Sequence, residues 1–338
     1  MPSIERESHR IVIAGASSLL GAELKTLLEE STFGGWDLRL LDEEDAAGTL
    51  TEAGGEPVVI QPVDEGSFER ARFVFFTGSP EFAQRNCAAA LAAGAVAIDF
   101  TGKVSTKDQA PSPWFPKLDE FWSTRFTSNG TKFWIPSAAA VAATSLSFGL
   151  RQVGLRKLSV TFFRPVSEAG RAGIEELESQ TGQLLSFQSV GKLVFDTQVA
   201  FNLLERYGSA SRQNLARVRK AVREEINACV ANHRAVVPAL QVLHAPTFYG
   251  MMFSGCAELD PGVADSESVS NACRGAGFSV AKDEDCTPSN VSAAGENTIQ
   301  LGVPQSDPAV SGTWWFWGAA DNVRLPAWNA VKLAEKLL

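Results

Sequence analysis

Short apolar runs alternate with helix-like spacing along the first hundred residues. Four apolar runs have the length of buried strands: 10–14, 38–41, 73–76 and 96–100. Between them, residues 22–29 and 82–93 repeat apolar positions at helical spacing, and Gly94 stands where a helix C-cap favours glycine. Strands that alternate with helices predict a parallel sheet covered on both faces, which is the doubly wound α/β fold.

The rest of the chain predicts a mixed α+β region. Its expected elements follow in this order: a helix at 138–150, a strand at 157–164, helices at 173–185 and 215–230, strand-like stretches within 236–253, an aromatic strand at 314–317 and a helix at 327–338. Residues 106–129 are expected to be loop, and residues 260–277 are expected to be a loop with a short helix. The run Trp314-Trp315-Phe316-Trp317 is interpreted as a buried strand or a subunit interface.

The length of 338 residues fits two domains better than one. The change from alternating strands and helices to the mixed pattern places the boundary near residue 135. We therefore expect a Rossmann-type nucleotide-binding domain over 1–135 and a second domain over 136–324. A C-terminal helix at 325–338 is expected to return to the first domain.

Composition and charge argue against several classes of protein. With 39 acidic and 30 basic residues, the net charge of −9 disfavours binding to nucleic acid. No apolar run approaches the ~18 residues that a membrane span needs, so no membrane association is expected. The five cysteines form no CxxC pair, so neither a zinc site nor a disulfide framework is expected. A reducing, cytoplasmic location is the simplest interpretation.

A glycine-containing loop joins the first predicted strand to the first predicted helix, where dinucleotide folds hold a pyrophosphate. Its pattern is GxxSxxG, and its candidate cofactor-binding residues are Gly15, Ser17, Ser18, Leu19, Leu20 and Gly21. Ser18 places a side chain where the backbone would come closest to a phosphate, although its hydroxyl could donate a hydrogen bond. A tight turn that binds nothing fits the same pattern.

An acidic run, Asp42-Glu43-Glu44-Asp45, follows the second predicted strand. An acidic residue at this place commonly accepts the ribose hydroxyls of NAD, whereas four acids would repel the additional phosphate of NADP. An exposed acidic loop without a ligand explains the run equally well. The run therefore argues against NADP more strongly than it argues for NAD.

Segments along nearly the whole chain resemble, in order, the aspartate-semialdehyde dehydrogenase family. They are 10–23, 75–99 (ending AGAVAID), 166–177 (VSEAGRAGIEEL), 198–203 (QVAFNL), 245–250 (APTFYG), 320–324 (ADNVR) and 329–335 (NAVKLAE). The resemblance implies a Rossmann-type nucleotide-binding domain and an α+β semialdehyde-dehydrogenase-type dimerisation domain. It also implies a homodimer and a place in amino-acid biosynthesis.

The family's reaction interconverts aspartyl phosphate and aspartate semialdehyde, using phosphate and NADP. It needs a cysteine thiolate, a histidine base and an arginine that binds the substrate carboxylate. The positions that match these three residues carry Ala138, Met251 and His244, and Arg164 stands in place of a family glutamine. The strongest resemblance is thus to Usg-type proteins, which are similar to the dehydrogenase but lack its cysteine.

Other positions match the family less completely. Asn322 belongs to a segment that lies near the nicotinamide in the family, and Arg171 and Arg164 keep positive charge near the former substrate pocket. A family arginine that helps to bind phosphate or substrate falls at Ser105. Basic residues also remain on the predicted substrate helix: Arg217, Arg219 and Lys220.

Three functional hypotheses follow. The first is a non-catalytic paralogue that keeps the fold and binds NAD, NADP, a small anion or no ligand. The second is an active oxidoreductase with a relocated nucleophile, for which the candidates are Cys256, Cys229 and Ser137, while His9 and His233 have no visible catalytic partner. The third is a heteromer in which this chain modulates an authentic dehydrogenase.

Overall fold

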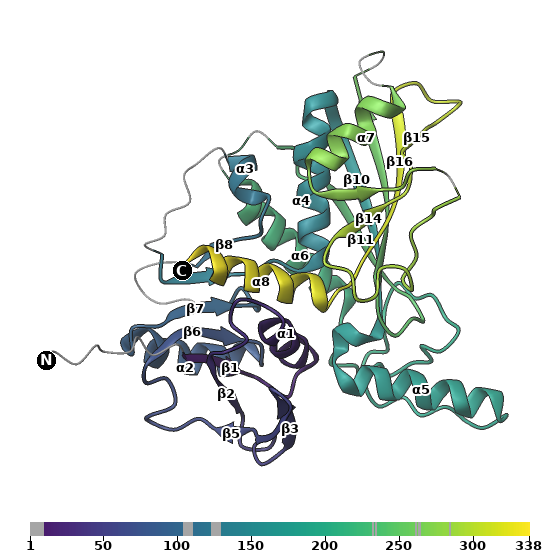
Figure 1. Cartoon of the computed structure of the whole chain (residues 1–338). Helices are drawn as coiled ribbons and strands as arrows, with labels where there is room; N and C mark the ends of the chain where they lie inside the picture. The colour runs from purple at the N-terminus through teal and green to yellow at the C-terminus, as the bar shows by residue number, and fades with distance from the viewer. Residues whose placement is uncertain are drawn as a thin grey trace, which may run out of the picture. The chain divides into compact units, whose positions relative to one another are not determined.

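The computed structural model describes residues 10–103, 111–122, 130–231, 233, 235–260, 262, 265–283 and 285–338. The described chain divides into two compact units (Figure 1). The first unit holds residues up to 119, 130–136 and 326–338, and the second holds 120–122 and 137–325. No helix of the described residues is long and apolar enough to cross a membrane.

A parallel sheet forms the centre of the first unit, in the order β5-β2-β1-β6-β7-β9-β8. Its elements are β1 (Arg10–Ala14), α1 (Leu19–Glu29), β2 (Asp37–Asp42), β5 (Gln61–Pro62), β6 (Ala71–Phe76), α2 (Pro80–Ala92), β7 (Val96–Asp99), β8 (Ser112–Pro113) and β9 (Lys132–Trp134). A hairpin of β3 (Leu50–Ala53) and β4 (Glu56–Val59) stands apart from this sheet. The predicted doubly wound α/β fold is confirmed.

Successive side chains of a strand point to opposite faces of the sheet. Since most residues of these strands are apolar, both faces of the sheet are apolar. Ile11 and Ile13 pack in a cluster with α1 and with α8 (Arg324–Lys336), which supplies a row of small and apolar side chains. Val12 and Ala14 pack in a second cluster with α2. Buried residues on alternate faces explain why the strands read as continuous apolar runs in the sequence.

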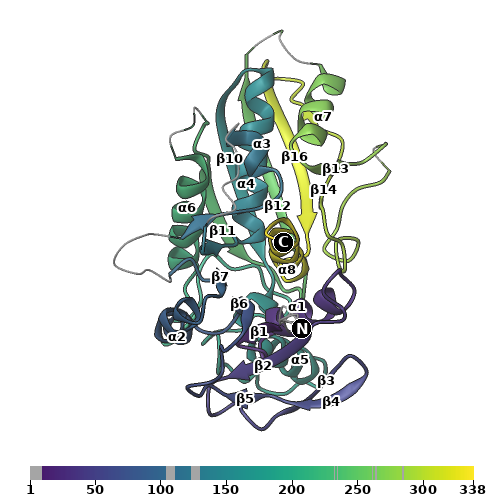
Figure 2. The ribbon, with the colours of Figure 1, turned by 60° about the vertical axis from the view of Figure 1, so that its left-hand side comes forward.

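The second unit is built on a mixed sheet in the order β11-β10-β12-β16-β14-β13, with β15 paired to β16. Its elements are α4 (Ala138–Leu150), β10 (Leu155–Arg164), α5 (Arg171–Leu185), α6 (Leu215–Val230), β11 (Ala239–His244), β12 (Met251–Leu259), α7 (Ser266–Gly275), β13 (Phe278–Val280), β14 (Ile299–Leu301), β15 (Gln305–Ser306) and β16 (Thr313–Ala320). Helices α4, α6 and α7 pack on one face of the sheet (Figure 2).

The aromatic run of strand β16 is buried on one side and exposed on the other in the isolated chain. Trp314 and Phe316 face the helices and are buried, but the alternate residues Trp315 and Trp317 are 46% and 39% exposed. They lie opposite Cys256 and Ser254 of β12 on the face that the helices do not cover. In the isolated chain the aromatic part of this strand is therefore buried on one face only, whereas Ala319 farther along the strand is buried on the other face as well.

Several elements were not expected from the sequence. The segment predicted as loop from 106 to 129 contains β8 and the short helix α3 (Leu118–Trp122), although much of it lies outside the described residues. The hairpin β3–β4 and strand β14 are only four and three residues per strand, too short for a periodic signal. By contrast, the short helix expected within 260–277 is present as α7, which begins with a capping box on Asp265 and Ser268.

Candidate ligand pocket and nucleotide loop

Close packing at the start of the first unit requires the two glycines of the glycine loop. Gly15 has a φ of +103°, and a Cβ on it would lie 2.1 Å from the main-chain nitrogen of Gly78. A Cβ on Gly21 would lie 2.5 Å from the carbonyl oxygen of Gly15. The loop thus turns from β1 into α1 with the ends of β1 and β6 in backbone contact, a turn that only glycine permits at Gly15.

The hydroxyl of Ser18 is used within the loop itself. It caps α1 by accepting from the Gly21 N–H at 2.9 Å, and it donates to the Gly15 carbonyl at 2.8 Å. A bond from this hydroxyl to a phosphate would break that arrangement, so the structure does not support the donor role considered for Ser18. Among the described residues, no acceptor meets the main-chain N–H groups of Leu19 and Leu20 in the first turn of α1. These amides, at the positive end of the helix, are the groups of the loop that can hold an anion.

Two carboxylates of the acidic run, Asp42 and Glu43, form hydrogen bonds beside the glycine loop. Asp42 is 6% exposed, and its two oxygens accept the N–H groups of Ser17 at 2.7 Å and Glu43 at 2.9 Å. Glu43 accepts a hydrogen bond from Ser79, the N-cap of α2, at 2.8 Å and lies 3.4 Å from the Arg85 guanidinium. Negative charge is therefore fixed at the carboxyl end of β2, beside the loop, rather than spread over a solvated segment.

The positions that match the family's catalytic residues lie around one pocket of about 190 Å³ in the second unit. Its lining comes from the start of α4, from β10, β11 and β12, and from one face of α6: Ser137, Ala139, Phe162, Arg164, Glu168, Val218, Ala221, Val222, Glu225, Val242 and Met251. Ala138 is the first residue of α4 and is buried beside this lining. At the two positions that the resemblance assigns to the nucleophile and the base, the side chains are thus a methyl group and a thioether, and neither group can act as a nucleophile or a base.

Ser137 and Glu225 close the N-terminal end of α4. Glu225 Oε2 accepts both the Ser137 hydroxyl at 2.6 Å and the Ser137 main-chain N–H at 2.8 Å. The same hydroxyl accepts from the Ala140 N–H and so caps the helix. A carboxylate of the protein itself therefore occupies the positive end of α4, the place that would otherwise attract an external anion. Glu225 was not identified from the sequence.

The guanidinium of Arg164 is buried, with 4% of the residue exposed, and four acceptors surround it. Nε donates to Glu168 Oε2 at 2.8 Å, and Nη2 donates to the Glu168 carbonyl at 2.8 Å and to Gln213 Oε1 at 3.2 Å. Nη1 donates to the Tyr207 hydroxyl at 3.3 Å. Burial alone would lower the pKa of Arg164, but the neighbouring charge of Glu168 reverses the effect and raises it. Four of the five N–H groups of Arg164 are thus engaged within the protein, and its charge is balanced by Glu168, before any ligand enters.

His244 continues this chain of hydrogen bonds. Its Nδ1 lies 3.3 Å from the Tyr207 hydroxyl, and its Nε2 lies 3.3 Å from the Val199 carbonyl. Because a carbonyl can only accept, the proton of the neutral ring is on Nε2, and Tyr207 donates to Nδ1. Burial lowers the pKa of His244 to about 4. A neutral, enclosed imidazole cannot replace the arginine that binds a substrate carboxylate.

The structure places the remaining candidates in different surroundings. The Asn322 side chain accepts from the Gly250 N–H at 3.1 Å and donates to Ser167, so it connects two turns of the second unit. Arg217 and Lys220 are exposed and do not line the pocket. His233 stacks on Trp122 with ring centroids 5.3 Å apart. His9 and Ser105 lie outside the described residues.

None of the five cysteines is an activated thiol. Burial raises the pKa of Cys87 to about 11 and of Cys273 to about 12, and it also raises that of Cys229 and Cys256. A hydrogen bond with Asp283 raises the pKa of Cys286. Cys256 points to the face of β12 opposite to Met251, because the two residues are an odd number of positions apart. All five are free, and in the described part of the chain no group of three or more potential ligands could hold a metal.

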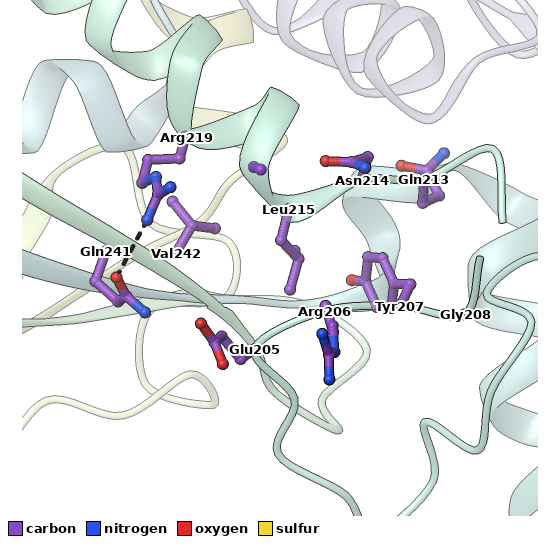
Figure 3. A pocket seen from close by; sticks show the side chains of 11 residues that line it. Glu205, Arg206, Tyr207, Gly208, Gln213, Asn214, Leu215, Arg219, Gln241 and Val242 are labelled. Atoms are coloured by element: carbon purple, nitrogen blue, oxygen red, sulfur yellow. Dashed lines mark hydrogen bonds between the residues drawn. The ribbon is translucent and has the colours of Figure 1, made fainter.

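A second pocket, of about 200 Å³, lies at the other end of the α6 face (Figure 3). It is bordered by the N-cap Asn214, by Gln213 and Tyr207, and by Arg219, whose guanidinium donates to Gln241 at 3.4 Å. Arg219, one of the basic residues expected at the former substrate site, therefore belongs to this separate, polar pocket. Its lining contrasts with the apolar lining around Met251.

Comparisons with known proteins cover both units. The family model "Semialdehyde dehydrogenase, NAD binding domain" matches residues 10–116, and "Semialdehyde dehydrogenase, dimerisation domain" matches residues 148–325. A USG-1 protein homolog of Azotobacter vinelandii is 29% identical over 335 residues, covering 97% of each chain. Aspartate-semialdehyde dehydrogenase 2 of Vibrio cholerae is 25% identical over 340 residues, covering 98% of each chain.

Solved structures are similar over the same length. A probable aspartate-semialdehyde dehydrogenase from Pseudomonas aeruginosa has a TM-score of 0.82 and 25% identity, covering 97% of this chain and 98% of that one. Aspartate semialdehyde dehydrogenase II from Vibrio cholerae gives the same TM-score, identity and coverage. The likeness extends through both units.

The buried imidazole predicts a specific pH dependence of stability. The unfolded ring takes up a proton near pH 6.5, whereas the folded ring resists protonation until about pH 4. This contribution is therefore complete above pH 6.5 and is lost as the pH falls towards 4, amounting to about 3 kcal/mol. Chemical denaturation of the wild type and of His244→Gln across this range should give a difference in unfolding free energy that shrinks on acidification. Parallel curves for the two proteins would contradict the buried neutral state.

Proposed function

Because the chain belongs to the semialdehyde dehydrogenase family, we propose that it is an aspartate-semialdehyde-dehydrogenase-like protein that has lost this reaction and acts by binding ligands. The observation that carries the proposal is the pair Ala138 and Met251 at the head of α4 and of β12. The reaction needs a thiolate that forms a thioester and a base that activates it. Removing a nucleophile from a catalytic group that acts as a unit costs on the order of 10⁴ to 10⁶ in rate.

The state of the substrate anchors supports the same proposal. An acyl phosphate brings a carboxylate and a phosphate, which both require unpaired cationic donors. Arg164 already donates to Glu168, Tyr207 and Gln213, and His244 is neutral. Binding the family's substrate here would first require these internal bonds to break.

A relocated nucleophile receives no support from these positions. Cys256 faces away from the pocket, and the pKa of its thiol is raised by burial. Cys229 is fully buried, with its pKa raised for the same reason. Ser137 donates to a carboxylate rather than to a neutral base, so its hydroxyl is held as a helix cap. The active-oxidoreductase hypothesis is therefore the weaker one.

We further propose that the first unit binds NAD in preference to NADP. The Leu19 and Leu20 amides at the start of α1 would hold the pyrophosphate, while Asp42 and Glu43 stand at the strand end where dinucleotide folds place the adenosine ribose. A 2′-phosphate would meet these two carboxylates, and Arg85 is already beside Glu43. When bound, the nucleotide would offer a nicotinamide for hydride transfer, for which this chain lacks the thiolate partner.

The second unit is proposed to form a homodimer through the sheet face that its helices leave uncovered. Trp315 and Trp317 lie on this face, and large aromatic side chains are enriched at the centres of such interfaces. The matching model for this region describes a dimerisation domain. The same face could accept a subunit of an authentic dehydrogenase. We favour a second copy of this chain, because a homodimer requires no other protein. Free cysteines throughout support a reducing compartment, and we propose the cytoplasm.

For the proposed function, the first prediction is that the protein does not catalyse phosphate-dependent oxidation of aspartate semialdehyde. With NAD or NADP at high protein concentration, nucleotide absorbance should change no faster than in buffer. The protein must be produced in a strain without the authentic dehydrogenase, which otherwise contaminates the assay. Turnover that persists after further purification would overturn the proposed loss of catalysis, and Cys256→Ala would then test the relocated thiol.

The second prediction concerns the nucleotide. Calorimetric titration should give a dissociation constant for NADP at least about tenfold higher than for NAD, which corresponds to about 1.4 kcal/mol of charge repulsion. Glu43→Gln should narrow the ratio because it removes one carboxylate and frees Arg85. Glu69→Gln is the matched control, because it makes an equal change of charge just before β6, at the amino-terminal end of the strands rather than at their carboxyl end. Equal affinities in the wild type would refute the role of the acidic pair.

The third prediction tests the dimer. Light scattering after size-exclusion chromatography should give the mass of a dimer for the wild type and of a monomer for Trp317→Lys. Phe187→Lys is the control, because Phe187 is 99% exposed at the end of α5, away from the sheet face. A dimer that survives Trp317→Lys with unchanged stability would show that this face is not the interface.

A further inference from the structure

The pocket of the second unit has an apolar interior, although it lies where the family carries out chemistry on charged groups. Phe162 and Val242 come from β10 and β11, Met251 comes from β12, and α6 contributes Val218 and Val222. Helix α6 presents these side chains at helical spacing, so its whole pocket face is hydrocarbon until Glu225. A site with this lining stabilises a ligand mainly by taking apolar surface out of water.

The charged groups at the rim are already engaged with one another. Arg164 donates to Glu168 and to neutral acceptors, and the Glu225 carboxylate occupies the N-terminal end of α4 through Ser137. With one cation and two carboxylates in the lining, an entering anion gains no unpaired positive charge and faces two negative ones. Desolvation of an ion without a partner is costly, whereas an uncharged molecule avoids this penalty.

The size of the pocket limits the ligand to about one ring. Its volume is about 190 Å³, and an apolar cavity of about 150 Å³ is enough to bind benzene. A single hydroxyl or amide on the ligand can donate to a carboxylate oxygen at the rim, because a carboxylate accepts several hydrogen bonds. A phosphorylated amino acid has neither the charge nor the polarity that this lining favours.

We propose that this pocket binds a small, uncharged, largely apolar molecule bearing one hydrogen-bond donor, in place of the anionic substrate of the family. The proposal rests on the proposed loss of catalysis, because it assigns a different ligand class to the same pocket. The Glu225 carboxylate, held by Ser137, acts here as a built-in anion that excludes anionic competitors. Selectivity thus comes from charges that are paired inside the protein before the ligand arrives.

The experiment compares two probes of the same shape and different charge. Binding of 4-fluorobenzyl alcohol and 4-fluorobenzoate is followed by ¹⁹F NMR line broadening on the full-length protein without nucleotide. We expect the alcohol to bind at least about tenfold more tightly than the benzoate, a difference of about 1.4 kcal/mol. Neither nucleotide binding nor turnover enters this measurement, so its failure is distinct from failure of the proposed function.

Filling the pocket locates the binding. Ala221→Leu adds a branched side chain to the lining and should abolish binding of the alcohol. Ala216→Leu makes the same change on an exposed position of α6 that borders the polar pocket of Figure 3, and it should leave binding unchanged. Circular dichroism checks folding, and Val218→Phe is a second filling variant in case Ala221→Leu does not fold.

Changing the rim charge tests the origin of selectivity. Glu225→Gln removes the carboxylate from the N-terminal end of α4, and we expect benzoate to bind more tightly while the alcohol changes little. The proposal is overturned if the alcohol does not bind up to its solubility limit. It is equally overturned if benzoate binds the wild type as tightly as the alcohol does and loses this binding in Ala221→Leu. Alcohol binding that stays intact in both filling variants would also overturn it.

Discussion

A buried guanidinium must have its N–H groups paired, and the pairing of Arg164 organises much of the second unit. Its partners come from separate stretches of chain: Glu168 just after β10, and Tyr207 and Gln213 in the long connection before α6. Through Tyr207 the requirement extends to His244 on β11. Losing any one partner would leave a desolvated donor, so the irregular segment between α5 and α6 is held in place by the charge at the end of β10.

This network also explains how the site can diverge while the fold is retained. The matches to dehydrogenase structures extend along the whole chain at about 25% identity, so the backbone framework tolerates wide substitution. Two of the positions that the resemblance assigns to substrate binding, Arg164 and His244, are joined to each other through Tyr207. Satisfied internal bonds stabilise the protein, but they withdraw the same groups from a substrate.

Periodicity in the sequence was sufficient for the framework. The alternating strands and helices of the first unit, the long helices α4 and α6, and the resemblance to aspartate-semialdehyde dehydrogenases and Usg-type proteins are confirmed. The site was only partly accessible, because Glu225 and Tyr207 act through contacts between segments far apart in sequence. Glu225 stands where the apolar stripe of α6 would continue, and Tyr207 is one of only two tyrosines; both were signals that could have been noticed. The role of Ser18 depended on local capping geometry rather than on its place in a motif.

The packing of α8 has a consequence for how the protein is made. This helix supplies a wall of the first unit's core through the small and apolar side chains Ala327, Ala330, Val331, Leu333, Ala334 and Leu337. The ribosome, however, translates it after the whole of the second unit. The strands of the first unit are therefore synthesised long before α8 is available to complete their core. The continuous segment 137–325, by contrast, can fold as it emerges from the ribosome. The domain that is synthesised first is thus completed last, and until α8 is made one apolar face of its sheet lacks the helix that covers it.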